Sequence, residues 1–197
     1  LRLLDDRDHG LSRGEMEIAY QPQARARTGE VVSAEALMRW HHPELGPVPP
    51  NHFIPIAEET GFIRELTVWA IERVMADARL LQERGRSVRL GVNLSSRLLC
   101  DPTFCNRALD LVKDAPELIT FEITESLAIG DWKMAMGFLK TFAAWGIPIA
   151  IDDYGAGMSS LAYIQQLPAQ ELKIDRQFIT QITQSHRDPL LVRSTIE

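Results

Sequence analysis

The sequence predicts an α/β fold in which parallel strands are covered by helices. After an opening pair of strands, short β-branched runs alternate with helical stretches. Such alternation is typical of parallel sheets, because neighbouring parallel strands need a crossover between them. Acidic, amide and lysine side chains stand at or near the C-terminal ends of successive predicted strands. A (β/α)8 barrel assembles its active site at those ends, whereas an open doubly wound sheet uses only strands beside a switch point, so these positions favour the barrel.

The first half of the chain predicts a hairpin followed by helices. Residues 1–13 suggest a lead-in helix, residues 15–22 a strand that Pro22 ends, and residues 31–40 a second strand after a turn at residues 27–30. Residues 41–50 contain four prolines and a glycine, which predicts a loop. A short helix over 53–60 and a long amphipathic helix between Gly61 and Gly85 follow.

The second half predicts four strands, each followed by a helix. The strands cover residues 88–94, 118–123, 149–151 and 171–174. The helices cover residues 103–112, 131–145 and 159–166 and continue from residue 178 to the end. We find no repeats, low-complexity tracts or linkers, so residues 1–197 are expected to form a single domain.

The composition is that of a globular protein with an acidic surface. Of the 197 residues, 45% are hydrophobic, and the formal net charge is −6, which argues against binding a nucleic-acid polymer or an anionic membrane. Cys100 and Cys105 lack the partners of a zinc site and predict reduced thiols. No run is long enough to insert into a membrane. We expect a cytoplasmic domain, or the cytosolic part of a membrane-attached parent; the first residue, Leu1, suggests excision from a longer protein.

Two adjacent carboxylates, Asp152 and Asp153, follow the buried run at residues 149–151. Neighbouring acids repel each other and stay ionised most easily beside a positive charge such as a metal ion. Gly155 and Gly157 allow a sharp turn and a close approach to a ligand. A helix cap is the alternative explanation of an isolated pair of this kind.

The other polar strand ends favour the metal over the cap. The group consists of hard oxygen ligands and one lysine: Glu35, Asn93, Glu122, Asp152, Asp153 and Lys173. This ligand set suits Mg²⁺ or Mn²⁺, and four carboxylates exceed the need of one ion, so two ions are expected. Two such ions suit displacement at phosphorus. Each residue also has a structural explanation; Lys173, for instance, could be a buried ion-pair partner of one acid.

Six stretches, in this order and spacing, resemble the EAL domain family of bacterial cyclic-di-GMP-specific phosphodiesterases. They cover nearly the whole chain from about residue 15 onward and are Tyr20-Gln21-Pro22, Glu35-Ala36-Leu37-Met38-Arg39-Trp40, Val92-Asn93-Leu94-Ser95, Glu122-Ile123-Thr124-Glu125-Ser126, Asp152-Asp153-Tyr154-Gly155-Ala156-Gly157-Met158-Ser159-Ser160-Leu161 and Leu172-Lys173-Ile174-Asp175-Arg176. The resemblance implies a modified (β/α)8 barrel with an antiparallel first strand, which agrees with the opening hairpin. It implies hydrolysis of cyclic-di-GMP to linear pGpG with Mg²⁺ or Mn²⁺, and inhibition by Ca²⁺.

The resemblance also implies residue roles. The first metal would be held by Glu35, Asn93, Glu122 and Asp152, and the second by Asp152 and Asp153. Lys173 would hold the catalytic water, which makes Lys173, Glu35 and Asp152 the expected catalytic residues. The expected substrate contacts are Gln21, Leu37 and Arg39, and Glu125 would anchor the loop after Asp153. A homodimer and further domains of a longer parent protein are the expected partners.

Two departures from the family pattern affect these expectations. The usual Asp-Asp-Phe-Gly-Thr-Gly-Tyr reads Asp-Asp-Tyr-Gly-Ala-Gly-Met here. The chain also stops at Glu197, before the family's last two strands and a Glu-Gly-Val-Glu motif whose first glutamate helps bind the second metal. We therefore expect a C-terminally incomplete barrel, with the Asp152 site nearly complete and the Asp153 site weak.

Two other functions compete with the phosphodiesterase. A catalytically impaired relative could bind cyclic-di-GMP as a sensor module, but such relatives usually lose ligand residues, and none is lost within residues 1–197. A different metal-dependent barrel enzyme, such as an enolase-like one, would also place acids and a lysine on strand ends. That alternative leaves the motifs around Gln21 and Arg39 unexplained.

Overall fold

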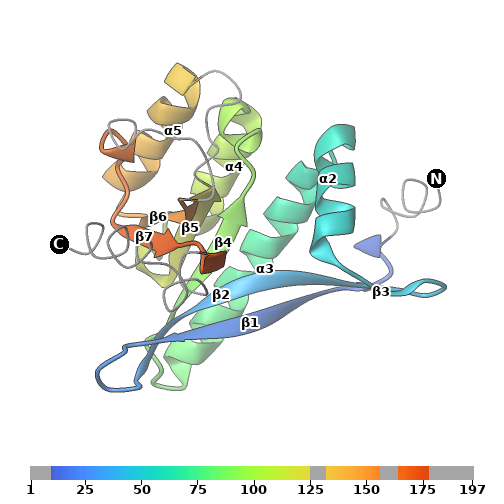
Figure 1. Ribbon diagram of the computed structural model, residues 1–197, viewed down its shortest axis with the longest axis horizontal. Coiled ribbons are helices and arrows are strands. Elements are labelled where there is room, and N and C mark those ends of the chain that lie inside the picture. The colour runs from blue at the N-terminus through green and yellow to red at the C-terminus, as the bar shows by residue number, and fades with distance from the viewer. Residues whose placement is uncertain (1–9, 125–131, 156–163, 178–197) are drawn as a thin grey trace.

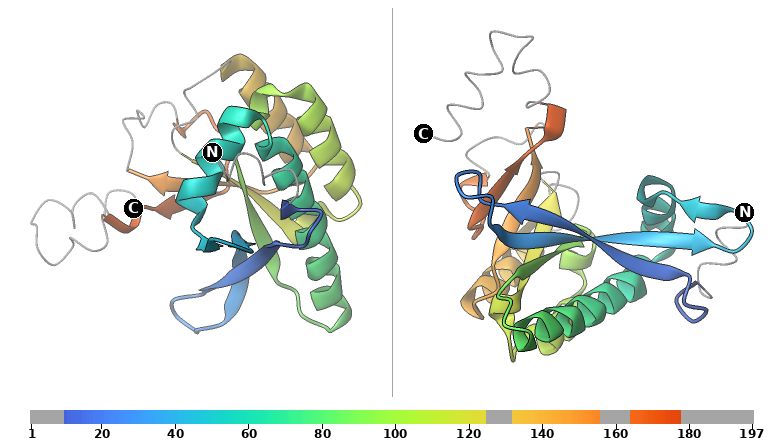
Figure 2. Two further views of the ribbon diagram at one scale, coloured as in Figure 1. Left: turned by 90° about the vertical axis from the view of Figure 1, so that its right-hand side faces the viewer. Right: turned by 90° about the horizontal axis from the view of Figure 1, so that it is seen from below.

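The computed structural model describes residues 10–124, 132–155 and 164–177, and contains a curved mixed sheet with helices packed along it (Figures 1 and 2). In chain order the elements are β1 (Met16–Ala24), β2 (Val31–His42), β3 (Gly46–Val48), α2 (Pro50–Thr60), α3 (Ile63–Glu83), β4 (Arg89–Leu94), the 3₁₀ turn η1 (Leu98–Cys100), α4 (Pro102–Val112), the 3₁₀ turn η2 (Pro116–Leu118), β5 (Ile119–Thr124), α5 (Trp132–Ala144), β6 (Ile149–Tyr154) and β7 (Glu171–Ile174).

The order of the strands decides between the two predicted architectures. The main path of the sheet is β1-β2-β4-β5-β6-β7, with β3 attached to β2. Along this path each strand lies beside the one before it, without the reversal that creates the switch point of a doubly wound sheet. β1 is antiparallel to β2, and the pairs β2–β4, β4–β5, β5–β6 and β6–β7 are parallel. The barrel-type topology with an antiparallel first strand is therefore confirmed.

The opening hairpin forms as predicted but is longer. Gly29 closes its turn with φ 71° and donates its backbone N–H to the carbonyl of Arg25 over 2.8 Å. The prediction that Pro22 ends the first strand is wrong, because β1 continues to Ala24 and Pro22 pairs with Ala34. Proline has no N–H to donate, and it is tolerated here because β1 lies at an edge of the described sheet.

The predicted loop over residues 41–50 also contains regular structure. β2 extends to His42, and β3 pairs with its end as a second small hairpin. His42 is buried, and its Nδ1 accepts the backbone N–H groups of Glu44 (3.1 Å) and Leu45 (3.2 Å). A side chain thus satisfies the turn between β2 and β3, which the proline-rich sequence did not reveal.

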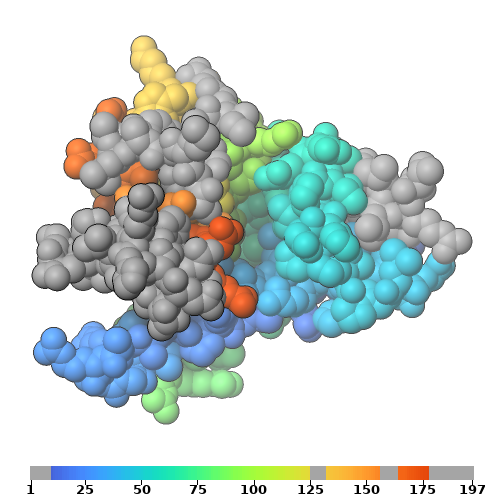
Figure 3. All heavy atoms as spheres, viewed as in Figure 1, coloured from blue at the N-terminus to red at the C-terminus, as the bar shows by residue number. Residues whose placement is uncertain are grey.

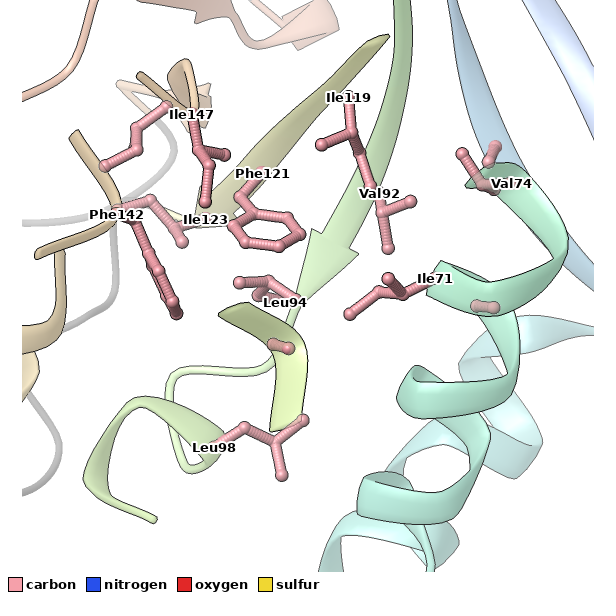
Figure 4. Close-up of a cluster of buried hydrophobic side chains, with 14 of the residues drawn as sticks. Ile71, Val74, Val92, Leu94, Leu98, Ile119, Phe121, Ile123, Phe142 and Ile147 are labelled. Carbon is pink, nitrogen blue, oxygen red and sulfur yellow. The ribbon is translucent and has the colours of Figure 1, made fainter. Parts of the chain in front are cut away.

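The core lies between the sheet and the helices α3, α4 and α5 (Figures 2 and 4). The amphipathic face of α3 supplies Ile71 and Val74, which are fully buried. Phe121 of β5 meets Phe142 of α5 edge to face, with 5.1 Å between the ring centroids. Burial of such aromatic and aliphatic side chains is the main force that holds helices onto a sheet. The core thereby fixes where the strands end.

The helix ends follow local chemistry. Asp101 caps α4, since its Oδ1 accepts the backbone N–H groups of Thr103 (3.0 Å) and Phe104 (3.2 Å). Gly61 ends α2 in the left-handed conformation, with φ 80°. The helices predicted over 1–13 and 159–166 and from 178 onward lie largely or wholly outside the described residues. Within the described residues, no helix is long and apolar enough to span a bilayer.

Candidate active site

Three carboxylates and one lysine from four different strands meet on the inner side of the sheet. Nζ of Lys173 donates to Oε2 of Glu35 at 2.7 Å, to Oε2 of Glu122 at 2.6 Å and to Oδ2 of Asp152 at 3.3 Å. Only 4% of the Glu122 side chain is exposed, against 16–21% for the other three. We call these four residues the acid–lysine cluster.

The strand register explains why these residues meet although they are up to 138 positions apart. Asn93 of β4 lies opposite Glu122 of β5, and Thr124 of β5 lies opposite Asp152 of β6. Parallel strands end at the same side of the sheet, so polar residues near each C-terminus converge. The apolar residues of the same strands face the helices. Their burial offsets the free-energy cost of bringing the acids together.

Gly91 makes room for the most buried acid. It lies on β4, and a Cβ atom at this position would collide with Oε1 of Glu122 and lie 2.8 Å from Cδ. Glycine in a strand interior commonly marks the close approach of another group. Sequence reasoning did not single out Gly91; its place two residues before Asn93, in an otherwise β-favouring run, was the available signal.

The acids of the cluster have little contact with solvent, and this disfavours their ionised forms. Burial raises the pKa of Glu122 from 4.5 to about 7, although the hydrogen bond and charge of Lys173 act in the opposite direction. Burial by itself would lower the pKa of Lys173, but its hydrogen bonds with Glu122 and Glu35 outweigh this and raise the pKa. Lys173 therefore remains positively charged and pairs with all three carboxylates.

Asn93 joins the cluster through Glu35. Its Nδ2 donates to Oε1 of Glu35 over 2.8 Å. Because the amide nitrogen already has this acceptor, the amide oxygen is the atom of Asn93 suited to a cation. One oxygen from each of Glu35, Glu122 and Asp152 lies within 4.8 Å of the others. Carboxylate and amide oxygens form the hard donor set that Mg²⁺ and Mn²⁺ prefer, so these residues fit such an ion.

Asp152 and Asp153 occupy different environments. The prediction that the strand ends at residue 151 is wrong, because β6 continues to Tyr154 and contains both aspartates. Asp152 points into the cluster, while Asp153 is exposed and adopts φ 54°, the left-handed conformation that aspartate tolerates better than most residues. Its backbone N–H donates to Oδ1 of Asp152 over 3.0 Å. Desolvation, followed by the charges of Asp152 and Asp175, raises the pKa of the Asp153 carboxyl group.

A pocket of about 280 Å³ adjoins the cluster; we call it the side pocket. Leu37 and Arg39 of β2 line it, as does Asn93 of β4. Glu35, Leu37 and Arg39 are two residues apart along β2, so they share one face of the strand. The side pocket therefore continues from the face of β2 that carries Glu35. Figure 3 shows the molecule hollowed between α2 (teal) and the region of β7 (orange), with deeper green atoms at the bottom.

The structure places the remaining predicted residues as follows. Gln21 of β1 lies directly opposite Glu35 in the antiparallel register, next to the cluster. Arg39 bonds through Nη1 to the backbone carbonyl of Met38 at 2.9 Å. Glu125 lies outside the described residues, so its role as a loop anchor stays a prediction. Sequence reasoning also missed Glu58 of α2, which lines the side pocket.

Comparisons with known proteins place this arrangement in a family. The family model described as EAL domain matches residues 4–197. An uncharacterized signaling protein from Caulobacter vibrioides is 39% identical over 197 residues, covering 98% of this chain and 24% of the relative. The bifunctional diguanylate cyclase/cyclic di-GMP phosphodiesterase MucR from Pseudomonas aeruginosa is 36% identical over 205 residues, covering 100% of this chain and 29% of MucR. The chain thus spans less than a third of these relatives.

A solved structure supports the same assignment. The structure described as PaMucR phosphodiesterase in complex with c-di-GMP superposes with a TM-score of 0.91 at 34% sequence identity, and covers 98% of this chain and 80% of that one. The EAL enzyme Bd1971, in a form described as bound to cAMP and cyclic-di-GMP, gives a TM-score of 0.90 at 29% identity over 99% of this chain and 55% of that one. The family resemblance found in the sequence is confirmed, and the chain belongs to the EAL domain family.

Proposed function

We propose that this chain hydrolyses cyclic-di-GMP to linear pGpG with the help of Mg²⁺ or Mn²⁺. The observation that carries the proposal is the acid–lysine cluster, in which three carboxylates from separate strands converge on one side of the sheet. Family membership and the names of the phosphodiesterase relatives support it. The chemistry is the addition of water across one phosphodiester: the hydroxyl joins phosphorus, and a proton goes to the departing 3′ oxygen.

In this proposal each residue of the site has a separate role in the reaction. Glu35, Asn93, Glu122 and Asp152 would hold one divalent ion, and Asp152 with Asp153 would contribute to a second. Such ions, when bound, neutralise charge on the phosphate and acidify water. Lys173 is a fixed ammonium beside the acids and would donate a hydrogen bond to a water or a phosphate oxygen at the site.

The substrate contacts in the proposal lie on the strands next to the cluster. Arg39 lines the side pocket and carries a guanidinium suited to a phosphate oxygen. Leu37 adds apolar surface to the same pocket, and Gln21 lies across from Glu35. A volume of about 280 Å³ lies just below the ~300–1,000 Å³ of common ligand pockets, which suits one part of a dinucleotide and not the whole molecule.

The test is turnover by the purified full chain. Chromatography of cyclic-di-GMP incubated with Mn²⁺ should show pGpG, and Asp152→Asn should abolish most of it. Asp110→Asn is the matched control, because Asp110 is an exposed aspartate on α4 that pairs with Lys113. Tight binding in calorimetry without any turnover would contradict the enzyme and favour the sensor module.

The expected assembly belongs to the same proposal. We propose that the chain forms a cytoplasmic homodimer and is one domain of a longer parent protein. The longer parent is supported by the chain's coverage of only 24–29% of the relatives named above. Light scattering of the full chain at several concentrations tests the dimer, and a monomer at all of them would exclude it.

A further inference from the structure

Two segments that are distant in sequence form facing walls of the side pocket. One wall is a face of α2, where Pro50, Ile54 and Glu58 are four residues apart and therefore lie on one side of the helix. The other wall contains Ser95 and Ser96, which directly follow the last residue of β4. Ser95 is outside the strand, so the parallel ladder does not fix it.

Glu58 joins these two walls. Oγ of Ser95 donates to Oε1 of Glu58 over 2.6 Å, a distance typical of a charge-assisted hydrogen bond between a hydroxyl and a carboxylate. Nη1 of Arg97 reaches the backbone carbonyl of the same Glu58 at 3.5 Å. Oγ of Ser95 also accepts the backbone N–H of Arg97 at 3.4 Å. Glu58 therefore holds residues 95–97 with its side chain and its main chain.

The acid–lysine cluster has its own supports and does not depend on Glu58. Asn93 is fixed by its position in the β4–β5 ladder and by its hydrogen bond to Glu35. Lys173 connects Glu35, Glu122 and Asp152 directly. Loss of the Glu58 contact should thus loosen the wall of the side pocket and leave the cluster in place.

We propose that Glu58 is a positioning residue for substrate binding, acting through Ser95. The carboxylate of Glu58 sets the distance between α2 and residues 95–97, and with it the width of the pocket that receives one part of the cyclic dinucleotide. This inference rests on the proposed function. It predicts a change in substrate affinity without a change in the chemical step.

The experiment compares Glu58→Ala, Glu58→Gln, Ser95→Ala and the double variant Glu58→Ala/Ser95→Ala in the full chain. KM and kcat for cyclic-di-GMP, Mn²⁺ affinity and the melting temperature are measured for each. Glu58→Ala should raise KM about tenfold, the effect expected for a lost hydrogen bond to a charged group, with kcat and Mn²⁺ affinity near wild type. Glu58→Gln keeps an acceptor for Ser95 and should restore most of the affinity. Ser95→Ala should match Glu58→Ala, and the double variant should be no worse than either.

Three results would overturn the proposal. A fall in melting temperature with unchanged KM would make Glu58 purely structural. A fall in kcat or Mn²⁺ affinity would assign it to the cluster. A Gln variant as weak as the Ala variant, with additive effects of Glu58 and Ser95, would mean that the carboxylate contacts substrate itself. Wild-type turnover is measured first: its absence would reject the phosphodiesterase, whereas normal turnover with a failed Glu58 series rejects only this inference.

Discussion

The acid–lysine cluster and the side pocket lie next to each other but are built in different ways. In the cluster, three carboxylates with little solvent exposure surround one ammonium group, and each carboxylate lies on the inner side of the sheet. The side pocket is lined by more apolar than polar groups and is bounded partly by a helix and by residues after a strand. The closely spaced charges are carried by strands in a ladder, whereas the side pocket is bounded by elements held together by side-chain contacts such as Ser95–Glu58.

The largest effect that separates the two regions is expected from Lys173→Met. In the proposed mechanism Lys173 is a donor at the reacting phosphate or water, so its loss should lower kcat by roughly 10²–10³-fold. Steady-state kinetics with saturating Mn²⁺ measure it. Lys113→Met, which removes an exposed lysine paired with Asp110, is the control and should leave kcat unchanged. An increase in KM with normal kcat would instead assign Lys173 to binding.

The second effect concerns the pocket side of β2. Arg39→Ala should raise KM by roughly tenfold to a hundredfold, because the proposed charged hydrogen bond to phosphate would be lost, while kcat should change less. Arg107→Ala removes an exposed arginine that pairs with Glu72 and provides the matched control. If kcat fell as steeply as for Lys173→Met, the division between cluster and pocket would not hold.

The third effect is a pH dependence that arises mainly from Glu122, the most buried acid of the cluster. In the metal-free protein, Glu122 has a pKa of about 7, above its ordinary 4.5, so the folded state binds more protons than the unfolded chain between these values. The free energy of unfolding should therefore fall as pH rises from 4.5 to 7, by at most about 1.4 kcal/mol per unit of pKa shift.

Urea unfolding in EDTA between pH 4.5 and 7.5 measures this slope. Glu122→Gln should flatten it, and Mn²⁺ should reduce it because a cation favours the ionised carboxylate. A slope that survives in Glu122→Gln would place the titrating group elsewhere in the molecule.

The smallest effect is expected from Gly91→Ala. The added methyl group meets the carboxylate end of Glu122, a buried side chain that must shift to admit it, so stability should fall by about 1 kcal/mol. Gly137→Ala in α5, where a Cβ has open space, should instead stabilise by about 0.5–1 kcal/mol through helix propensity. Thermal unfolding of both variants checks the pair; equal shifts would show that Gly91 has no spatial role.

The regular elements and the family could be predicted from sequence because their signals are local. The strand over 171–174 and the helical stripe between Gly61 and Gly85 follow from spacing and side-chain type. The errors lie where tertiary contacts decide. Pro22 continues a strand because that strand lies at an edge of the described sheet, and the end of β2 forms a hairpin with β3 whose turn His42 completes. A short stretch of sequence reveals neither the sheet edge at which Pro22 lies nor the turn that His42 completes.

For the site, the sequence by itself determined which side chains are available: hard oxygen ligands and a lysine at the ends of successive strands. Only the tertiary structure decided their partners. It placed one ammonium within 3.3 Å of three carboxylates, directed Asp152 inward and left Asp153 exposed, and joined Glu58 to Ser95 across 37 positions. The physical reason is that residue type and periodicity are properties of the local chain, whereas distances between carboxylates depend on strand register and on how helices pack against the sheet.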